Sequence, residues 1–469
     1  MKQIPNDFIQ QMDKLIGQDE TNALVSALGD TTATTSIRHN ARKLNIEAEV
    51  LFPEAQTSPV GWCAKGVYLS DRPSFVLDPI FHAGGYYVQE AASMFIEQAY
   101  LKIAGEHVPN KVLDLCAAPG GKSTLWRSLL PDGALLVANE PIRQRADILA
   151  ENLLKWGHPD VVVTNAYPHE FSGLNDFFDV IAADVPCSGE GMFRKDDTAI
   201  SEWSLQNVAD CVARQWKIVC DVWDCLREGG YMVYSTCTFN ADENENMIAN
   251  ICNRLGAEIV PLPVQAEWNI STLTPEGGVK NAVEQNNGMY HFYPHKTRGE
   301  GLFLCLLRKT SEAPALKIKK DKTQKQQQVL LEVKKTLTWL RNPNDFALIS
   351  TDDGQWSAVK KQLAEDMILL RKQVRCLANG IPLAESKGKK MAPQHGLALS
   401  TERSDTAFPT VEVDLPTAIA YLRHEAITIE APKGWVIVTY KHLPLGFVNN
   451  LGTRANNMYP QVWRIRKSV

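Results

Sequence analysis

The most informative segment of the chain is Val112-Leu113-Asp114-Leu115-Cys116-Ala117-Ala118-Pro119-Gly120-Gly121-Lys122-Ser123. A short apolar run ends at an acidic residue and breaks into a Pro-Gly-Gly turn, after which Ser123 to Leu130 has a helical pattern. This order is typical of a Rossmann-like sheet, in which a strand delivers the chain at its carboxyl end to a tight glycine turn. Because glycine has no side chain, the backbone of such a turn can approach a nucleoside cofactor closely.

A second apolar run, Ala134 to Asn139, ends at Glu140, which follows Gly120 by 20 residues. Rossmann-like folds place a carboxylate for ribose hydroxyls at this offset. A phosphate-binding P-loop would need a glycine where Cys116 stands, and a dinucleotide fingerprint would need three spaced glycines, so neither motif fits. Glu140 and the strands that follow also disfavour the alternative that the turn merely connects a strand to a helix.

The whole chain has 469 residues, which is enough for two to four domains. It has no apolar run near the roughly 18 residues that a membrane span needs, and its start lacks the apolar stretch of a signal peptide. Its ten cysteines include no C-x-x-C pair, which disfavours a disulfide framework or a zinc site. We therefore expect a cytoplasmic protein with reduced thiols, no bound metal and no membrane partner.

Charge is unevenly distributed along the chain, whose formal net charge is −5. Residues 311–350 carry eight Lys or Arg against four Asp or Glu, and residues 421–469 carry seven against two. Local basic regions on an acidic whole favour a selective RNA-binding enzyme over a non-specific nucleic-acid coat.

The order of apolar runs and helical patterns predicts an α/β fold with a Rossmann-like core. The predicted domains are an N-terminal α/β domain at 1–88, the core at 89–310, a linker with a small mixed domain at 311–385, and a β domain at 386–469. Strands are expected at 111–115, 134–139, 160–164, 178–183 and 231–236, separated by helices, which indicates a parallel sheet. A late strand at 301–308 is expected at the edge of that sheet.

Several flanking segments have patterns of their own. Phe8 to Ile16 is predicted to be an amphipathic helix, and Asn240 to Gly256 a helix with acids in its first turn. The basic, hydroxyl-rich stretch from Thr34 to Lys43 is either a solvated loop or an element that contacts phosphates. The Lys- and Gln-rich residues 317–328 are interpreted as a linker, and 435–448 as a pair of strands in a small RNA-binding β domain.

Two cysteines follow predicted strands, Cys187 in Asp184-Val185-Pro186-Cys187-Ser188-Gly189 and Cys237 in Ser235-Thr236-Cys237-Thr238. Ligands of open α/β sheets bind at this edge, and a thiol there suggests covalent catalysis on an electrophilic carbon. Carbon 5 of cytosine fits this chemistry, because a thiolate that adds at carbon 6 makes carbon 5 nucleophilic towards a methyl donor. The Asp184 carboxyl group at ring nitrogen 3 would stabilise the adduct, and the base would have to leave its stack.

The residues alone leave the choice of thiol open. Either cysteine could instead be an inert buried thiol, and a Cys187–Cys237 disulfide would be unusual in a reducing cytosol. A Cys116/Cys187/Cys237 metal cluster lacks both suitable spacing and a histidine.

Four of these segments resemble motifs of the Nol/Nop/Sun RNA 5-methylcytosine methyltransferases, over about residues 30–310. They are Asp114 to Lys122, Ala138-Asn139-Glu140, Asp184 to Gly189, and Ser235 to Thr238. Three smaller segments also match: Ser36 to Asn40, which resembles the N-terminal RNA-contacting segment of the family, Arg194-Lys195-Asp196, and Tyr293 to Gly301.

The resemblance implies that S-adenosylmethionine is the cofactor, with Glu140 on its ribose and Asp184 nearby. The residues implied in binding it are Cys116, Ala117, Ala118, Pro119, Gly120, Gly121, Lys122, Glu140, Arg145, Asn165 and Asp184. The resemblance also implies Cys237 as the nucleophile and Cys187 as the thiol that helps to release the product, with Asp184 and Lys122 as further catalytic residues. The family often has an acid where Asn165 stands, although an asparagine can still hydrogen-bond an adenine amino group.

The C-terminal region narrows the expected substrate. His442 to Gly446, with Gly452, Asn457 and Tyr459-Pro460, resembles the PUA-like tail of the bacterial small-subunit rRNA methyltransferases of the F type. We therefore expect a monomeric RNA cytosine-5 methyltransferase that acts on 16S rRNA in the 30S subunit. The alternatives are the same reaction on tRNA and a non-catalytic rRNA-binding assembly factor, while the small basic tail disfavours a DNA methyltransferase.

Overall fold

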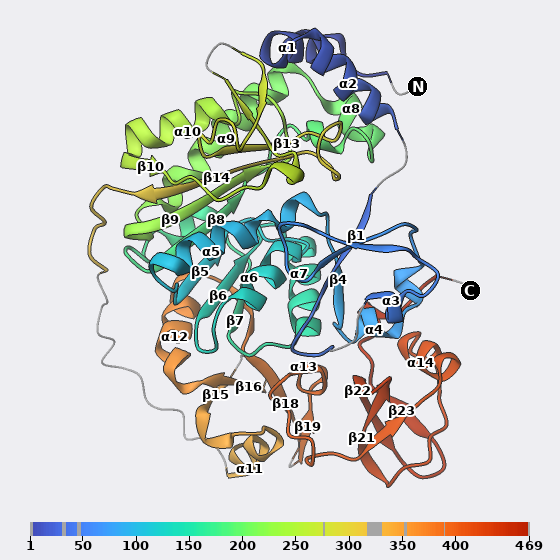
Figure 1. The fold of residues 1–469 in the computed structure, drawn as a ribbon. Helices are drawn as coiled ribbons and strands as arrows, with labels where there is room; N and C mark the ends of the chain where they lie inside the picture. The colour runs from blue at the N-terminus through green and yellow to red at the C-terminus, as the bar shows by residue number, and fades with distance from the viewer. Residues whose placement is uncertain are drawn as a thin grey trace.

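A mixed sheet of eleven strands passes through the middle of the molecule and carries the site (Figure 1). The computed structural model describes residues 3–30, 34–44, 48–274, 277–316, 331–350, 354–388 and 390–467. The strand order is β12-β11-β13-β14-β9-β8-β5-β6-β7-β17, with β10 also paired to β14. Their bounds are β5 Lys111–Asp114, β6 Leu135–Asn139, β7 Val161–Thr164, β8 Phe178–Asp184, β9 Leu226–Thr236, β10 Ala257–Ile259, β11 Ser271–Leu273, β12 Val279–Asn281, β13 Met289–Phe292, β14 Leu302–Lys309 and β17 Cys376–Asn379.

The five predicted strands form the parallel centre of this sheet, β9-β8-β5-β6-β7. Their side chains alternate between two cores: Val112 lies in the core on one face and Leu113 in the core on the other. Burial on both faces explains why the strands appear in the sequence as continuous apolar runs. The predicted α/β class with a Rossmann-like core is confirmed.

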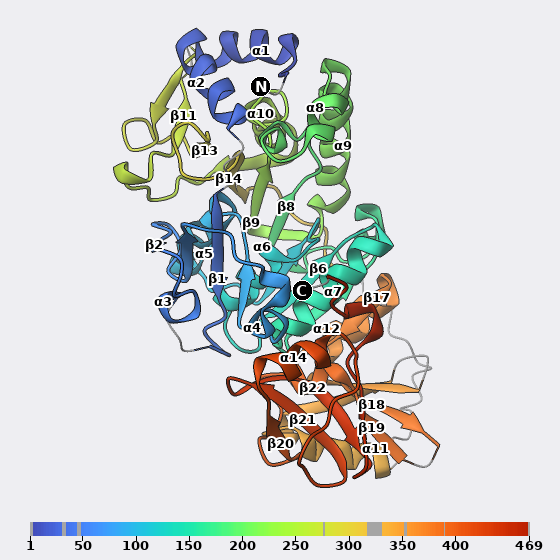
Figure 2. The ribbon, with the colours of Figure 1, turned by 90° about the vertical axis from the view of Figure 1, so that its right-hand side faces the viewer.

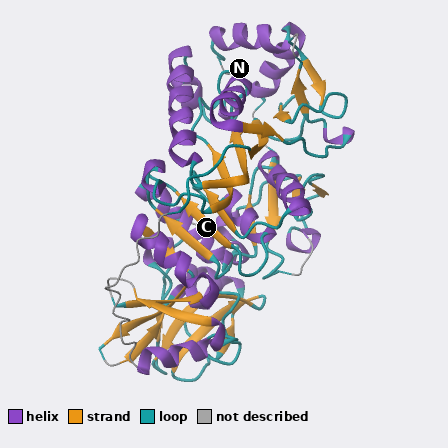
Figure 3. Cartoon of the chain, turned by 90° about the vertical axis from the view of Figure 1, so that its left-hand side faces the viewer, coloured by secondary structure: helices purple, strands orange, loops and turns teal. Residues whose placement is uncertain are grey.

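Helices cover both faces of the sheet, as the turned view in Figure 3 also shows. The core contains α5 Ile96–Glu106, α6 Gly121–Leu129, α7 Arg143–Trp156, α9 Leu205–Trp223 and α10 Glu245–Ile251. Helix α7 is capped by Gly157, whose φ of 85° favours glycine. Other helices are α3 Ala48–Leu51, α4 Pro79–His82, α8 Asp197–Glu202, α11 Leu331–Lys335, α12 Ala364–Gln373, α13 His395–Leu399 and α14 Leu415–Leu422.

Two predictions about individual elements are wrong. Strand β14 is not an edge strand, because β9 pairs on one side of it and β13 and β10 on the other. The helix expected from Asn240 begins only at Glu245, because the side chains of Asn240 and Glu243 bind neighbouring loops instead of extending the helix. Residues 317–328, interpreted as a linker, lie outside the described residues.

The two parts of the N-terminal region have different packing partners. Helices α1 (Asn6–Ile16, as predicted) and α2 (Gln18–Gly29) pack against Phe193 and Trp203 at one end of the molecule (Figure 2). The sheet β2-β3-β1-β4 shares a core with the last C-terminal sheet. Its strands are β1 Thr35–His39, β2 Thr57–Pro59, β3 Gly66–Leu69 and β4 Tyr86–Val88.

The C-terminal residues form two four-stranded sheets at the opposite end (Figures 1 and 2). The expected strand pair at 435–448 is the β21–β22 hairpin. The boundary predicted between 385 and 386 falls inside β18. The strands are β15 Phe346–Ser350, β16 Gln355–Lys360, β18 Ile381–Lys387 and β19 Lys390–Pro393 in one sheet, and β20 Thr410–Glu412, β21 Gly434–Tyr440, β22 Leu443–Asn450 and β23 Ala455–Asn457 in the other.

Strand β17 connects this C-terminal part to the core, because it pairs antiparallel with β7 and extends the central sheet. None of the helices in the described ranges combines the length and the apolarity that a membrane span requires.

Two histidines with buried ring nitrogens, His82 and His395, lie at the junction of the N- and C-terminal sheets and give an expected pH dependence of stability. Burial and the nearby Lys155 lower the pKa of His82 and that of His395 to about 3. The unfolded chain takes up these protons near pH 6.5 and the folded chain only near pH 3. The stabilisation is therefore complete above pH 6.5 and is lost as the pH falls from 6.5 towards 3, by up to about 1.4 kcal/mol per pH unit for each histidine.

Urea unfolding at pH 7 and pH 5 measures this effect, and His395→Phe is the informative variant. Neither ring nitrogen of His395 has a hydrogen-bond partner, so phenylalanine can take its place without an unpaired donor or acceptor. The variant should lose less unfolding free energy between the two pH values than the wild type. An equal loss would show that His395 does not contribute.

Candidate active site

The carboxyl ends of β5, β8 and β9 bring the predicted catalytic residues together. Asp184 at the end of β8 is paired in register with Ser235 of β9, and Asp114 of β5 lies opposite Ala182 of β8. Cys187 and Cys237 follow β8 and β9 by a few residues each. The motifs that follow separate strands in the sequence therefore share one edge of the sheet.

The two thiols are in direct contact: Cys187 Sγ and Cys237 Sγ lie 3.0 Å apart, and both cysteines are free. The Cys237 backbone N–H donates to Cys187 Sγ at 3.3 Å. The hydrogen bond with Cys237, together with burial and the negative charge of Glu243, raises the pKa of Cys187 well above its ordinary value. Cys187 thus stays a thiol in contact with Cys237.

Asp184 lies between a cation and a hydroxyl. Lys122 Nζ donates to Asp184 Oδ2 and Ser235 Oγ donates to Oδ1, both at 2.8 Å. Burial alone would lower the pKa of Lys122, but the adjacent Asp184 carboxylate raises it above its ordinary value. Lys122 is therefore a fixed positive charge that orients Asp184.

The glycine turn is held by polar contacts from several elements. The Ala117 N–H donates to Asn139 O at 2.8 Å, Arg145 donates to Ala118 O at 3.1 Å, and Asn152 donates to Pro119 O at 2.7 Å. Gly120 has a φ of 116°, which favours glycine, and a side chain there would lie 3.3 Å from Leu149. Burial raises the pKa of Cys116 far above its ordinary value, so this third cysteine stays a thiol.

Glu140 and Asn165 follow β6 and β7 at the same edge. Glu140 is 1% exposed, accepts the Ile142 N–H at 2.9 Å, and has Arg145 3.5 Å from its other oxygen. Asn165 Nδ2 donates to the carbonyls of Glu140 and Pro141 at 2.9 and 2.8 Å. Because the amide donors are used in this way, the atom that Asn165 can offer a ligand is its acceptor oxygen.

Asp114 lies beneath this edge. It is 1% exposed, accepts from Ser123 Oγ at 2.6 Å, and its second oxygen has no hydrogen-bond partner. Burial raises the pKa of Asp114 to about 7.

A network of buried polar side chains clamps the loops that carry the two thiols, and it was not predicted. Glu190 accepts the backbone N–H groups of Phe239 and Asn240 at 2.7 and 3.0 Å, and so links the Cys187 loop to the Cys237 loop. Glu243 accepts from the Ser188 N–H at 3.0 Å and from Gln215 at 2.7 Å. The sequence signal for this network was the polar residues directly after each cysteine. Their burial, however, depends on contacts between residues that lie about 50 positions apart in the chain.

The prediction for Thr34 to Lys43 requires correction. The first half of the segment is not a solvated loop, because Thr35–His39 forms β1, and Arg38 is not accessible to phosphates, because it is 1% exposed. Its guanidinium donates to Gln89 at 2.8 Å and to Thr124 at 2.6 Å in the first turn of α6, and stacks on Trp156. Arg38 thus stabilises the glycine turn through its contact with the first turn of α6.

Two of the three smaller segments singled out by resemblance, Arg194-Lys195-Asp196 and Tyr293 to Gly301, contact each other. Arg194 lies 3.2 Å from Glu300 in a buried ion pair, and Lys195 lies 3.3 Å from the same carboxylate. This contact fixes the loop after Cys187 to the segment that leads into β14.

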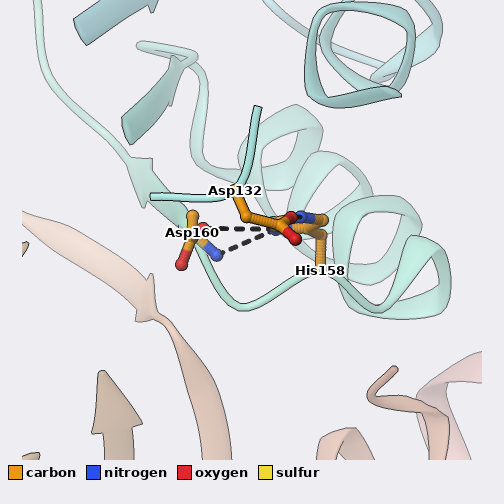
Figure 4. A group of neighbouring side chains, drawn as sticks. All are labelled: Asp132, His158 and Asp160. Atoms are coloured by element: carbon orange, nitrogen blue, oxygen red, sulfur yellow. Dashed lines mark hydrogen bonds and ion pairs between the residues drawn. The ribbon is translucent and has the colours of Figure 1, made fainter. Parts of the chain in front are cut away.

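Figure 4 shows a separate group, Asp132, His158 and Asp160, whose ligand atoms lie within 4.8 Å of one another, as in a metal site. Both ring nitrogens of His158 are already used: the Asp160 N–H donates to Nδ1, and Nε2 donates to Asp132, each at 3.1 Å. The Arg42 guanidinium also contacts Asp132 at 2.7 Å. The His158 ring therefore has no free lone pair for a metal ion, and the Arg42 cation lies beside Asp132. This arrangement suits a structural connection between loops and does not suit a metal ion.

The sheet order and the site at its carboxyl edge define a Rossmann-like methyltransferase. Among solved structures, a methyltransferase homologue from Pyrococcus horikoshii is similar, with a TM-score of 0.54 and 25% identity over 65% of this chain and 95% of that chain. NSun6 from Pyrococcus horikoshii, solved with SFG, has a TM-score of 0.53 and 18% identity over 66% of this chain and 100% of that chain.

Family models match three parts of the chain: the N-terminal domain of 16S rRNA methyltransferase RsmF at 4–91, 16S rRNA methyltransferase RsmB/F at 102–308, and the RsmF PUA domain at 408–465. Ribosomal RNA small subunit methyltransferase F of Enterobacter sp. (strain 638) is 30% identical over 97% of this chain and 95% of that protein. The protein of the same name from Photobacterium profundum is 28% identical over 98% and 96%. The chain belongs to the ribosomal RNA small subunit methyltransferase F family, as its motifs predicted.

Proposed function

We propose that this protein transfers a methyl group from S-adenosylmethionine to carbon 5 of a cytosine in 16S rRNA through a covalent thiol adduct. The observation that carries the proposal is the contact of Cys187 and Cys237 at 3.0 Å beside the Asp184–Lys122 pair. Two thiols in contact next to a charged carboxylate suit an addition and elimination on a pyrimidine ring.

The donor set at the ends of β5, β6 and β7 fits the cofactor. The turn from Cys116 to Lys122 offers backbone atoms, Glu140 offers a buried carboxylate for ribose hydroxyls, and Asn165 offers an acceptor for an adenine amino group. Arg145 spans from Ala118 O to Glu140 and holds the two sides together. The bound cofactor supplies the electrophilic methyl group.

Cys237 and Cys187 have different tasks in this scheme. The Cys237 thiolate adds to carbon 6 of the flipped cytosine, which makes carbon 5 nucleophilic towards the methyl group. Carbon 5 then passes its proton to water, and the electron pair of that C–H bond forms the double bond between carbons 5 and 6 and expels the Cys237 sulfur as a thiolate. The Cys187 thiol touches the leaving sulfur and donates a hydrogen bond to it, which aids release of the product.

Asp184 and Lys122 stabilise the adduct. Ring nitrogen 3 takes up a proton from solvent when the thiolate adds, and the Asp184 carboxylate accepts a hydrogen bond from it. Lys122 and Ser235 each occupy one oxygen of Asp184, which keeps the carboxyl plane in one orientation. Lys122 is in this sense a positioning residue for Asp184.

The rRNA substrate is supported by the names of the relatives and by the PUA match at 408–465. The proposed working form is a cytoplasmic monomer that acts on the 30S subunit. In the four-part division, we propose that residues 1–88 and 386–469 contact RNA, that residues 89–310 carry the chemistry, and that residues 311–385 attach the tail to the core through β17.

The test is to incubate the purified protein with labelled S-adenosylmethionine and, in parallel, 30S subunits, free 16S rRNA and tRNA. Digestion to nucleosides should place the label on 5-methylcytidine from 16S rRNA. Label on tRNA alone would keep the chemistry and change the substrate. Label on another nucleoside would contradict the thiol mechanism, and no label on any RNA would favour a binding factor.

Glu140→Gln is expected to weaken S-adenosylmethionine binding by roughly 10- to 100-fold, because it removes the charge from a buried hydrogen-bond acceptor. Calorimetric titration measures the affinity, and Asp147→Ala on the exposed side of α7 is the control. A thermal midpoint equal to that of the wild type would separate lost binding from lost folding. Unchanged affinity would argue against the ribose role of Glu140.

A further inference from the structure

A cleft between the core and the C-terminal part has no role in the chemistry described above. It has a volume of about 570 Å³ and is lined by α7 of the core, by residues 371–379 around β17, and by residues near His395 and Trp463. This volume is in the range of sites that hold small organic ligands, and one nucleotide of a strand would fit it.

The charged side chains that line the cleft are all positive. Arg143, Arg371 and Arg375 contribute guanidinium groups, and no Asp or Glu is among the lining residues in the described part of the chain. Arg143 pairs with the exposed Asp147, and Arg371 donates to Ser350 O at 2.9 Å. The exposed Arg375 side chain makes no hydrogen bond or ion pair with a described residue. A polyanion would complement this charge.

Two polar side chains in the lining lack partners within the protein. Asn379 is 4% exposed, and its Oδ1 has no hydrogen-bond partner. Both ring nitrogens of His395 are likewise unpaired. Buried polar groups without partners are rare in folded proteins, and both of these residues line the cleft.

An aromatic surface completes the cleft. The Trp463 ring is partly exposed and lies 5.1 Å from the His395 ring and 5.4 Å from Lys155 Nζ. Guanidinium groups beside an indole form the combination by which proteins bind the phosphates and the bases of single-stranded nucleic acids.

The cleft begins next to the cofactor edge of the sheet. The Asn165 N–H donates to Arg375 O at 2.9 Å, so the residue directly before β17 adjoins the expected adenine end of the cofactor site. Helix α7 runs from Arg145 at that site to Leu154 in the cleft. The cleft therefore adjoins the β7 side of the edge that carries the site.

We propose that this cleft binds a single-stranded nucleotide of the substrate RNA, with its phosphates on Arg371 and Arg375 and its base against Trp463. The inference rests on the proposed RNA methyltransferase function and names a second RNA contact outside the catalytic pocket. It also gives the segment from α12 to β17 a task, because Arg371 lies in α12 and Arg375 directly precedes β17.

The test uses Arg375→Ala and Arg375→Glu, since this exposed side chain has no partner whose loss would unfold the protein. The probes are a fluorescent oligocytidylate and 30S subunits. Arg375→Ala should bind the oligomer about tenfold more weakly, with a slope of log affinity against log salt shallower by about 0.7, and Arg375→Glu more weakly still. KM for 30S subunits should rise, while S-adenosylmethionine affinity stays at the wild-type value.

Arg254→Ala is the matched control, because this arginine stacks on Trp216 outside the cleft, and it should bind RNA as the wild type does. A 4-thiouridine-containing oligomer should crosslink to the peptide that carries Trp463. Wild-type RNA binding by Arg375→Glu would overturn the assignment, as would equally tight binding of free cytidine monophosphate in the cleft. If the wild type binds the oligomer through Arg375 but methylates no RNA, the proposed function fails and the cleft assignment stands.

Discussion

Cys237→Ala is expected to lower the rate of RNA methylation by about 10⁴-fold or more, as removal of a covalent nucleophile does in other enzymes. We infer that Cys237 is the reactive thiol, because the contact with Cys237 and burial raise the pKa of Cys187, which therefore keeps its proton. Single-turnover labelling of 30S subunits with labelled S-adenosylmethionine measures the loss. Cofactor affinity should stay unchanged, since Cys237 lies at the end of β9 and not at the glycine turn.

Two further variants make this result interpretable. Cys237→Ser keeps the shape of the side chain but carries a hydroxyl that does not ionise near neutral pH, and it should be nearly as inactive as the alanine variant. Cys220→Ala removes an exposed cysteine of α9 and should have full activity. If Cys237→Ala still forms 5-methylcytidine at more than a per cent of the wild-type rate, addition by Cys237 is wrong.

The parallel centre of the fold could be predicted from the sequence because burial on both faces leaves continuous apolar runs between glycine turns. Strand β17 could not be predicted, since Cys376 to Asn379 is short and pairs with Val162 to Thr164 more than 200 residues earlier. Its place depends on the docking of the C-terminal part, which leaves no periodic pattern in the sequence.

The residues of the candidate site also fall into two groups, those that could be predicted from the sequence and those that could not. Residues at strand ends, such as Asp184 and Glu140, were predictable because parallel strands end at one edge of the sheet. The burial of Arg38 could not be predicted, because its partners, Gln89 and Thr124, lie far away in the sequence. Its segment was therefore interpreted as a solvated loop or as an element that contacts phosphates. Glu190 and Glu243 were missed for the same reason: their function depends on burial between two loops.

The burial of Glu190 and Glu243 also bears on the separate roles of the Cys187 and Cys237 thiols. These carboxylates fix the backbone after Cys187 and after Cys237 to each other, so the contact between the sulfurs is rigidly maintained. A rigid contact allows proton exchange between the sulfurs in each cycle, and it predicts that removal of one thiol leaves the other correctly placed.

Cys187→Ala is therefore expected to form the adduct and fail to release it. Cys237 remains in place and adds to carbon 6, and methyl transfer can follow, but the group in contact with the departing sulfur is missing. A protein–RNA band that resists denaturation should accumulate on a gel, and turnover should stop after about one equivalent of label.

The accumulation has clear controls. The Cys187→Ala/Cys237→Ala double variant should give no band, because the bond to carbon 6 cannot form without Cys237. The wild type should give at most a transient band, and Cys220→Ala should match it. A band from Cys237→Ala and none from Cys187→Ala would reverse the two roles. A third outcome is that neither variant gives a band and that both lose turnover. The intact pair would then be needed for the addition itself, with the Cys187 proton stabilising the Cys237 thiolate before it attacks carbon 6.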